Sequence, residues 1–219
     1  MANDVRKLFL TCTLFIGVMC VSAQLSQHGL IVNGSIGDED SKIDKPPGGS
    51  WYELGYKAGF SVGYRLRFNK PTLHSFHFDM DVNIGARILS PVSYSPYGIG
   101  GGGSYTPDRF ISIGGTANYS FIKKFSIGLG VEPAYYFKKG IPGSITFPGH
   151  VEDIDWSRYF DRKNRFDIPV VAKIAYNFNR FEVGIVGKYG MINVLETEHF
   201  KYGKFRDVQL SIFIPFKTK

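Results

Sequence analysis

The sequence has almost no cysteine, and its two cysteines, Cys12 and Cys20, both lie near the N-terminus. The rest of the chain therefore has no disulfide and no cysteine-ligated metal site. After residue 23 the sequence also lacks a run of about 18 apolar residues, the length that indicates a transmembrane helix. Any membrane span must then be made of strands. The net charge of +7 is spread along the chain without a basic run, which argues against a nucleic-acid-binding protein.

The N-terminal segment has the composition of a secretory signal peptide. Two basic residues precede the mostly apolar stretch 8–21, and a Val-Ser-Ala sequence follows, which predicts a signal peptide over 1–23 with cleavage near Ala23. The alternative is a buried N-terminal helix or an anchor. A lipoprotein attached through Cys20 is disfavoured because a methionine precedes that cysteine. We expect one domain, a β-barrel, over 24–219.

The whole sequence is rich in aromatic residues (16%) and contains 26 glycines, and strong helix signals are absent after residue 23. Apolar and polar residues alternate with a period of two, which is the pattern of a strand with two different environments. The pattern predicts eight strands, at 28–37, 51–68, 74–89, 109–121, 125–138, 165–178, 181–191 and 205–216. The two strands joined by Asn179 and Arg180 show it clearly, and their two-residue link indicates a tight hairpin.

The connections between these strands alternate in length. Short turns are expected at 69–73, 122–124 and 179–180, and longer loops at 38–50, 90–108, 139–164 and 196–204. This alternation is typical of outer-membrane barrels. The predicted fold is all-β: an eight-stranded antiparallel up-and-down transmembrane β-barrel with short periplasmic turns and long external loops.

Alternation alone does not say which face of the barrel points inward, and a secreted lipocalin-type barrel would place its apolar face inside. The strands are longer than the ~9–11 residues that cross a bilayer. The polar face is rich in glycine and carries isolated charges of both signs in mid-strand, as expected for a narrow lumen. The predicted lumen charges are Glu53, Lys57, Arg65, Arg67, Asp79, Asp81, Arg87, Glu132, Lys173, Glu182, Lys188 and Asp207. Buried charges must pair, so we expect a salt-bridge network and no open pore.

Aromatic residues on the apolar face concentrate at two heights, as in the girdles at the two membrane interfaces. The predicted girdle beside the short turns is Phe68, Phe76, Phe121, Phe125, Phe178, Phe181 and Phe216. A second group lies toward the long loops: Tyr52, Tyr56, Tyr135, Phe137, Phe166 and Tyr189. The simpler interpretation is that aromatic residues favour strands in general, but it does not explain why those beside the short turns concentrate at one height.

The strand FDIPVVAKIAYNF (166–178), followed by a hairpin into GIVGKYGMINV (184–194), resembles the PorT-like outer-membrane barrel proteins of the outer membrane protein beta-barrel domain family. The signal peptide, the glycine-rich first strand and the eight-strand layout agree with this resemblance. It implies a barrel in the outer membrane of a Gram-negative bacterium, in contact with outer-membrane lipid and inserted by the barrel-assembly machinery. The chain departs from the usual aromatic C-terminus, because Phe216 is followed by Lys-Thr-Lys.

No residues with the spacing of a catalytic, cofactor or metal site emerge. The five histidines have no serine-containing catalytic motif beside them. Asp79 and Asp81 share a face and could hold a metal ion, but pairing with Arg65, Arg67 or Arg87 is favoured. In the loop 150–163, the residues Trp156, Tyr159 and Phe160 are a candidate partner surface, and a simple covering loop is the alternative.

The sequence thus predicts a non-enzymatic integral barrel without a cofactor. The resemblance implies a scaffold or accessory of an envelope or secretion complex, with external loops available to a protein partner. Two alternatives stay open: a narrow channel for small solutes, and a lipid-modifying outer-membrane enzyme.

Overall fold

The structure is a computed structural model, and it describes residues 25–43, 51–95, 98–102, 106–137, 145–147, 150–152, 164–192 and 200–216. Side chains are described for 25–37, 58–88, 107–137, 164–192 and 204–216. The predicted signal peptide and the candidate partner residues Trp156, Tyr159 and Phe160 lie outside these ranges. Among the described residues, no helix is both long and apolar enough to cross a membrane.

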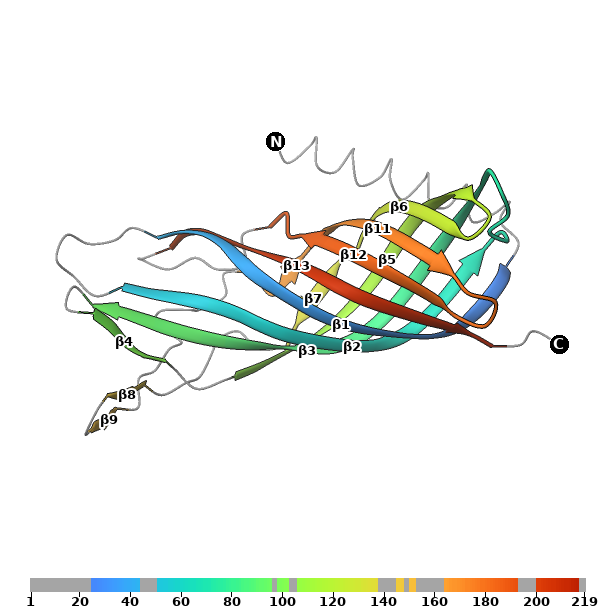
Figure 1. Cartoon of the computed structure of the whole chain (residues 1–219). Helices are drawn as coiled ribbons and strands as arrows, with labels where there is room; N and C mark the ends of the chain where they lie inside the picture. The colour runs from blue at the N-terminus through green and yellow to red at the C-terminus, as the bar shows by residue number, and fades with distance from the viewer. Residues whose placement is uncertain are drawn as a thin grey trace.

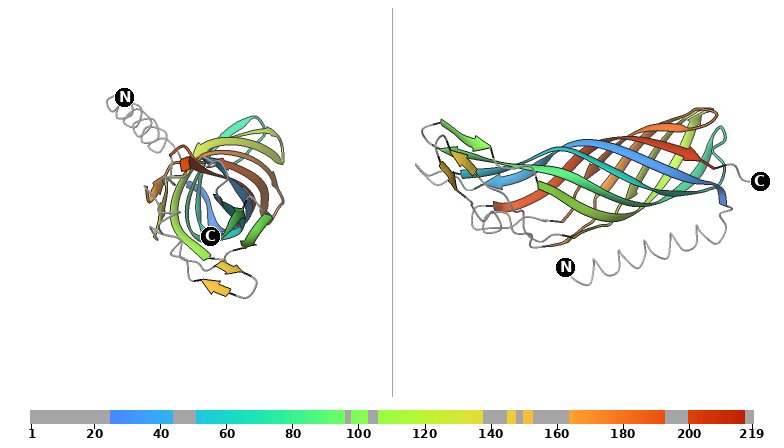
Figure 2. Two further views of the ribbon diagram at one scale, coloured as in Figure 1. Left: turned by 90° about the vertical axis from the view of Figure 1, so that its left-hand side faces the viewer. Right: turned by 90° about the horizontal axis from the view of Figure 1, so that it is seen from below.

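The described chain forms a closed, eight-stranded antiparallel barrel (Figures 1 and 2). Its strands are β1 (Leu25–Ile43), β2 (Trp51–Phe68), β3 (Ser75–Ser95), β5 (Thr106–Ile122), β6 (Phe125–Val131) with β7 (Ala134–Tyr136), β10 (Phe166–Asp167) with β11 (Val170–Asn177), β12 (Glu182–Tyr189) and β13 (Phe200–Pro215). Each pairs with its sequence neighbour, and β1 closes the ring by pairing with β13 from Gly29↔Pro215 to Ile43↔Phe200. The predicted fold class is confirmed.

Two of the predicted strands are interrupted, each at a proline. The fifth breaks at Pro133, between β6 and β7, and the sixth breaks at Pro169, between β10 and β11. Proline has no N–H to donate to the ladder. The barrel stays connected at the breaks, because the Ile113 N–H donates to the Pro133 carbonyl and the Glu132 N–H donates to the Pro169 carbonyl, both at 2.9 Å.

The predicted long loops are partly wrong. β1 continues to Ile43, β3 continues to Ser95 and is followed by β4 (Gly98–Gly102), and β13 already begins at Phe200. The strands β8 (Ile145–Phe147) and β9 (His150–Glu152) form a hairpin within 139–164. β1, β2, β3 and β13 therefore extend past the shorter strands at the long-loop end (Figure 1). In β1, β3 and β13 the period of two weakens in these extensions, whereas in β2 it continues to Trp51.

Charged side chains fill the inside of the barrel, and apolar side chains cover its outside. Arg67 and Asp79 are fully buried, whereas Phe60, Phe76 and Leu129 are each about two-thirds exposed at 66%, 69% and 68%. A water-soluble barrel has the opposite arrangement, with apolar residues inside.

Candidate functional site

The centre of the lumen holds six charged side chains from four strands, which we call the charge cluster. It consists of Arg65 and Arg67 on β2, Asp79 and Asp81 on β3, Lys173 on β11 and Glu182 on β12. They meet because each occupies an inward position of its strand, and because β2 and β3 are in a register that sets Arg65 opposite Asp81 and Arg67 opposite Asp79.

Both arginines bind their cross-strand aspartates through two hydrogen bonds. Arg65 donates from Nε to Asp81 Oδ1 and from Nη2 to Asp81 Oδ2, both at 2.7 Å. Arg67 donates from Nε to Asp79 Oδ1 at 2.6 Å and from Nη2 to Asp79 Oδ2 at 2.9 Å. Two parallel charge-assisted bonds fix the guanidinium plane as well as neutralising the charge. These pairs hold β2 to β3 on one wall of the barrel.

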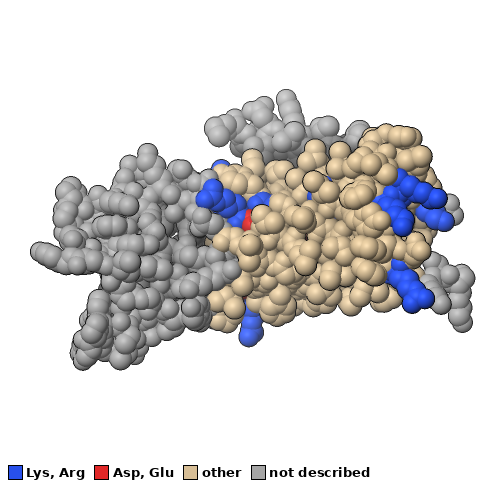
Figure 3. Space-filling view, viewed as in Figure 1, with Lys and Arg blue, Asp and Glu red and all other residues tan. Residues whose placement is uncertain are grey.

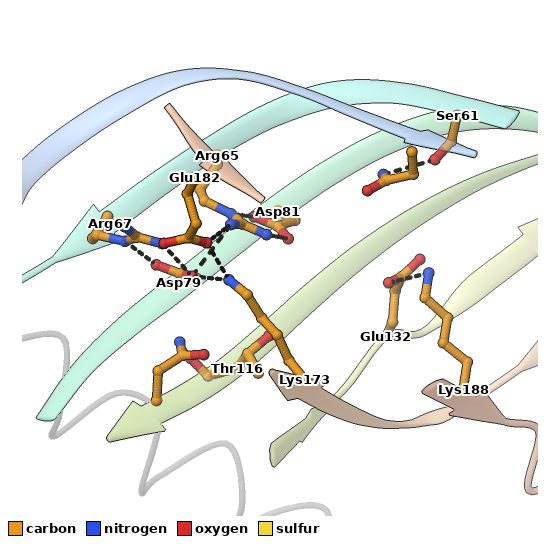
Figure 4. A network of polar contacts seen from close by, with 12 residues as sticks. Ser61, Arg65, Arg67, Asp79, Asp81, Thr116, Glu132, Lys173, Glu182 and Lys188 are labelled. Atoms are coloured by element: carbon orange, nitrogen blue, oxygen red, sulfur yellow. Dashed lines mark hydrogen bonds and ion pairs between the residues drawn. The ribbon is translucent and has the colours of Figure 1, made fainter. Parts of the chain in front are cut away.

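Lys173 and Glu182 connect this wall to the opposite one (Figure 4). Lys173 Nζ lies 2.7 Å from Glu182 Oε1 and 3.0 Å from Asp79 Oδ2. Glu182 also reaches the arginines, with Oε1 at 3.1 Å from Arg65 Nη1 and Oε2 at 2.7 Å from Arg67 Nη2. The contacts span the lumen, so they exclude a passage at this height.

The charge cluster contains three positive and three negative groups and is therefore neutral. All six side chains are buried, with at most 8% of the residue surface exposed. Moving a charged group out of water has a large unfavourable free energy unless the group is paired and hydrogen-bonded. The Phe213 ring also faces the cluster, with the guanidinium carbons of Arg65 and Arg67 at 5.2 and 5.0 Å from its centroid, so the arginines gain cation–π contacts as well.

A second pair lies nearer to the long-loop end of the lumen. Lys188 Nζ is 2.6 Å from Glu132 Oε2, and the Ser112 hydroxyl donates to Glu132 Oε1 at 2.8 Å. Asp207 is the register partner of Lys188 across β12 and β13. This group again joins strands from different parts of the barrel wall.

Arg87 is surrounded by aromatic rings rather than by the aspartates proposed for it. Its guanidinium carbon lies 4.4 Å from the Phe205 centroid, 4.7 Å from that of Tyr136 and 5.4 Å from that of Phe110. It also donates a hydrogen bond to the Tyr136 hydroxyl. Asp108 is its register partner on β5. We call these three rings and Arg87 the aromatic plug, because all four side chains are buried inside the lumen.

Little space is left between the charge cluster and the second pair. A cavity of about 20 Å³ lies there, lined by Arg65, Asp81 and Lys173 on one side and by Glu132 and Lys188 on the other. A volume of that size holds about one water molecule. A hydrated ion would therefore have to separate ion pairs in order to pass this part of the lumen.

The described histidines do not form a catalytic arrangement with one another. His28 Nδ1 lies 2.5 Å from the Tyr64 hydroxyl, and His74 Nδ1 lies 3.3 Å from the Tyr119 hydroxyl. His77 is buried in the lumen, and its ring nitrogens have no hydrogen-bond partner within the described part of the chain. Among the described side chains, no group of three or more His, Cys, Asp or Glu could hold a metal ion.

The face of the barrel shown in Figure 3 carries a broad band with almost no charge, and Lys and Arg lie toward both ends of this band. Among the predicted short-turn girdle residues, five are exposed beside the turns or the terminus: Phe76, Phe125, Phe178, Phe181 and Phe216. Phe68 and Phe121 are half-buried. At 4.6 Å between centroids, the rings of Phe178 and Phe181 stack across the Asn179–Arg180 turn. Phe125, Tyr176 and Phe178 extend this aromatic surface through contacts of 4.7 and 4.6 Å.

Most of the predicted lumen charges come together in the structure. Ten have described side chains, and all ten occupy inward positions, although Arg87 lies away from Asp79 and Asp81. Glu53 and Lys57 are on β2, with side chains outside the described set. Sequence reasoning misses four inward aromatic residues of the site: Phe110, Tyr136, Phe205 and Phe213. The alternation along each strand places these residues on the inward face, and this could have identified them, since an aromatic ring at an inward position of a narrow barrel must fill the lumen.

No family profile and no curated protein matches this sequence. Among solved structures, neisserial surface protein A is 12% identical with a TM-score of 0.44, over 86% of this chain and 97% of that chain. Ail of Yersinia pestis is 12% identical with a TM-score of 0.44, over 88% and 100%. The outer membrane protein OprG from Pseudomonas aeruginosa is 10% identical with a TM-score of 0.42, over 88% and 95%. Similarities of this size carry no information about function.

Proposed function

We propose that the protein is an integral barrel of the outer membrane of a Gram-negative bacterium, with a closed lumen and no enzymatic activity. The observation that carries this proposal is the inverted distribution of residues, with a paired charge cluster inside and a continuous apolar surface outside. In water that surface would be unfavourable, at roughly 25 cal/mol for each Å² of apolar area. In a bilayer it is solvated by lipid, and the closed ring leaves no unpaired sheet edge in the hydrocarbon.

The strand lengths support the same location. β2 and β3 contain 18 and 21 residues, whereas roughly 9–11 residues cross the hydrocarbon layer when tilted. The remainder of these strands would stand outside the membrane at the long-loop end. A sheet in that position suits a protein that presents a surface.

The role that fits this arrangement is a scaffold or accessory of an envelope or secretion complex, as the resemblance to PorT-like proteins implies. The protein would contact outer-membrane lipid and the barrel-assembly machinery during insertion, after cleavage of the signal peptide near Ala23. An envelope protein partner would bind at the extended end, where the loop containing Trp156, Tyr159 and Phe160 is attached. A narrow channel and a lipid-modifying enzyme are the competing functions, and the interlocked lumen charges favour neither.

Conductance in a planar bilayer tests the closed lumen. We expect the refolded protein to insert, as shown by a heat-dependent shift in gel migration, and to give no stable steps of porin size. A double variant, Lys173→Ala with Glu182→Ala, removes one positive and one negative side chain that cross the lumen. It should therefore admit more small-ion current than the wild type, which shows that the assay responds to this barrel.

Stable large steps from the wild-type protein would contradict the closed lumen. A change in lipid A composition that depends on the protein would favour the enzyme instead.

A further inference from the structure

Two neighbouring turns at the short-turn end present three cations together. Lys123 and Lys124 form the turn between β5 and β6, and Arg180 lies in the turn between β11 and β12. The turns are adjacent because β6 pairs with β11, and the Asn177 N–H donates to the Lys124 carbonyl at 2.7 Å. All three side chains are exposed. We call these three residues the turn patch.

The turn patch has no acidic neighbour in the turns at this end of the barrel. Segments 69–74, 122–124 and 178–181 are described throughout and contain no Asp or Glu. Every acidic side chain that the structure describes points into the lumen instead: Asp79, Asp81, Asp108, Glu132, Asp167, Glu182 and Asp207. The positive charge of the turn patch is therefore not neutralised by the rest of the described surface.

Aromatic rings hold the turn patch at the edge of the apolar band. Lys124 Nζ lies 5.9 Å from the centroid of the Tyr176 ring, and Arg180 belongs to the turn whose flanking rings, Phe178 and Phe181, stack on each other. Turns of two residues cannot extend far from the barrel. These cations thus remain at the height where lipid headgroups meet the hydrocarbon, the level that aromatic girdles mark.

An apolar hollow lies on the outer surface of the same strands, directly beyond the aromatic rings. It has a volume of about 640 Å³, and its lining includes Ala117, Ala172 and Gly187 among the larger side chains of Ile127 and Ile174. The register sets Ile127 opposite Ile174, two residues along from the Phe125↔Tyr176 pair. The hollow and the turn patch therefore form one continuous surface, with apolar walls at one end and positive charge at the other.

We propose that this surface binds one anionic glycerophospholipid, with its headgroup phosphate on the turn patch and an acyl chain in the hollow. The inference rests on the proposed membrane location. Phosphate is the complement of closely spaced Lys and Arg side chains, and an acyl chain complements a hollow bordered by isoleucines and rings. A soluble acidic partner would use the charge but would leave the hollow unexplained.

Native mass spectrometry of the full chain, released from nanodiscs of mixed phosphatidylglycerol and phosphatidylethanolamine, tests the proposal. We expect the wild-type protein to retain phosphatidylglycerol at a higher fraction than phosphatidylglycerol has in the lipid mixture of the nanodiscs. The variant Lys123→Gln/Lys124→Gln/Arg180→Gln should lose this preference by roughly tenfold to a hundredfold, since each of the three basic residues contributes up to roughly fivefold near an anionic surface. The control Arg109→Gln/Arg165→Gln/Arg206→Gln removes the same charge from exposed side chains toward the other end and should keep the preference.

The hollow has its own test. Ala172→Phe places a ring in the hollow from an outward position, so the lumen is unchanged, and it should reduce lipid retention without altering the heat-dependent gel shift. An equal loss in the control triple variant, or no effect of Ala172→Phe, would overturn the lipid site. Binding of acidic cell-wall fragments in place of phosphatidylglycerol would overturn it too. A protein that fails to enter nanodiscs at all would instead refute the proposed membrane location.

Discussion

The neutrality of the charge cluster leads to a prediction with a clear sign. Glu182→Gln removes one negative charge from a group of three positive and three negative side chains and leaves a buried positive charge unpaired. Lys173→Met leaves a buried negative charge in the same way. Removing one partner of a buried ion pair costs about 3–5 kcal/mol. Each single variant should therefore lower the free energy of unfolding by that amount, because both side chains are at least 96% buried.

The double variant Lys173→Met/Glu182→Gln restores neutrality. The two groups are 2.7 Å apart in the wild type, so their removal together should be less damaging than the sum of the single changes, with a coupling energy of about 1–3 kcal/mol. Urea unfolding in detergent micelles, followed by circular dichroism and gel migration, measures all four proteins. Lys70→Met, an exposed turn residue, is the control and should change stability by less than about 0.5 kcal/mol. Single-variant losses that simply add in the double variant would refute the reasoning.

Two further predictions concern the aromatic plug and the close approach of strands. Arg87→Ala removes the cation around which the plug is packed and should destabilise the barrel by about 2–4 kcal/mol in the same urea assay. Arg109→Ala, on the outward face of β5, is its control, and a similar loss there would argue against the plug. Gly130→Ala would place a methyl group against the backbone of β5 and should lower the yield of folded barrel in the gel-shift assay. Gly34→Ala has open space around the new methyl group, so equal yields for these two variants would contradict this interpretation.

The strength of the alternation explains why the fold is predictable from the sequence and why the ends of several strands are not. Inside the barrel region every strand separates lipid-facing from lumen-facing positions, so the alternation is strong, and β2 was predicted with its observed bounds. Beyond that region the alternation fades in β1, β3 and β13, so the pattern predicts their extensions as loops, whereas in β2 it continues to Trp51. The breaks at Pro133 and Pro169 carried a signal, because proline cannot donate to a ladder, but the strand pattern continues through both.

The sequence by itself determined which side chains share a face, because side-chain direction alternates along a strand whatever the partner strands are. That rule placed Arg65, Asp79 and Lys173 on the polar side, and the expectation of paired charges followed from the cost of burying them. Only the tertiary structure decided which charges pair. Arg65 and Glu182 are separated by 117 positions in the chain and meet because the closed ring brings β2 and β12 across a lumen only a few side chains wide. Arg87 is separated from Asp79 and Asp81 by its position farther along the same strand β3. Ring closure decided its neighbours, the rings of Phe110, Tyr136 and Phe205, which come from other strands.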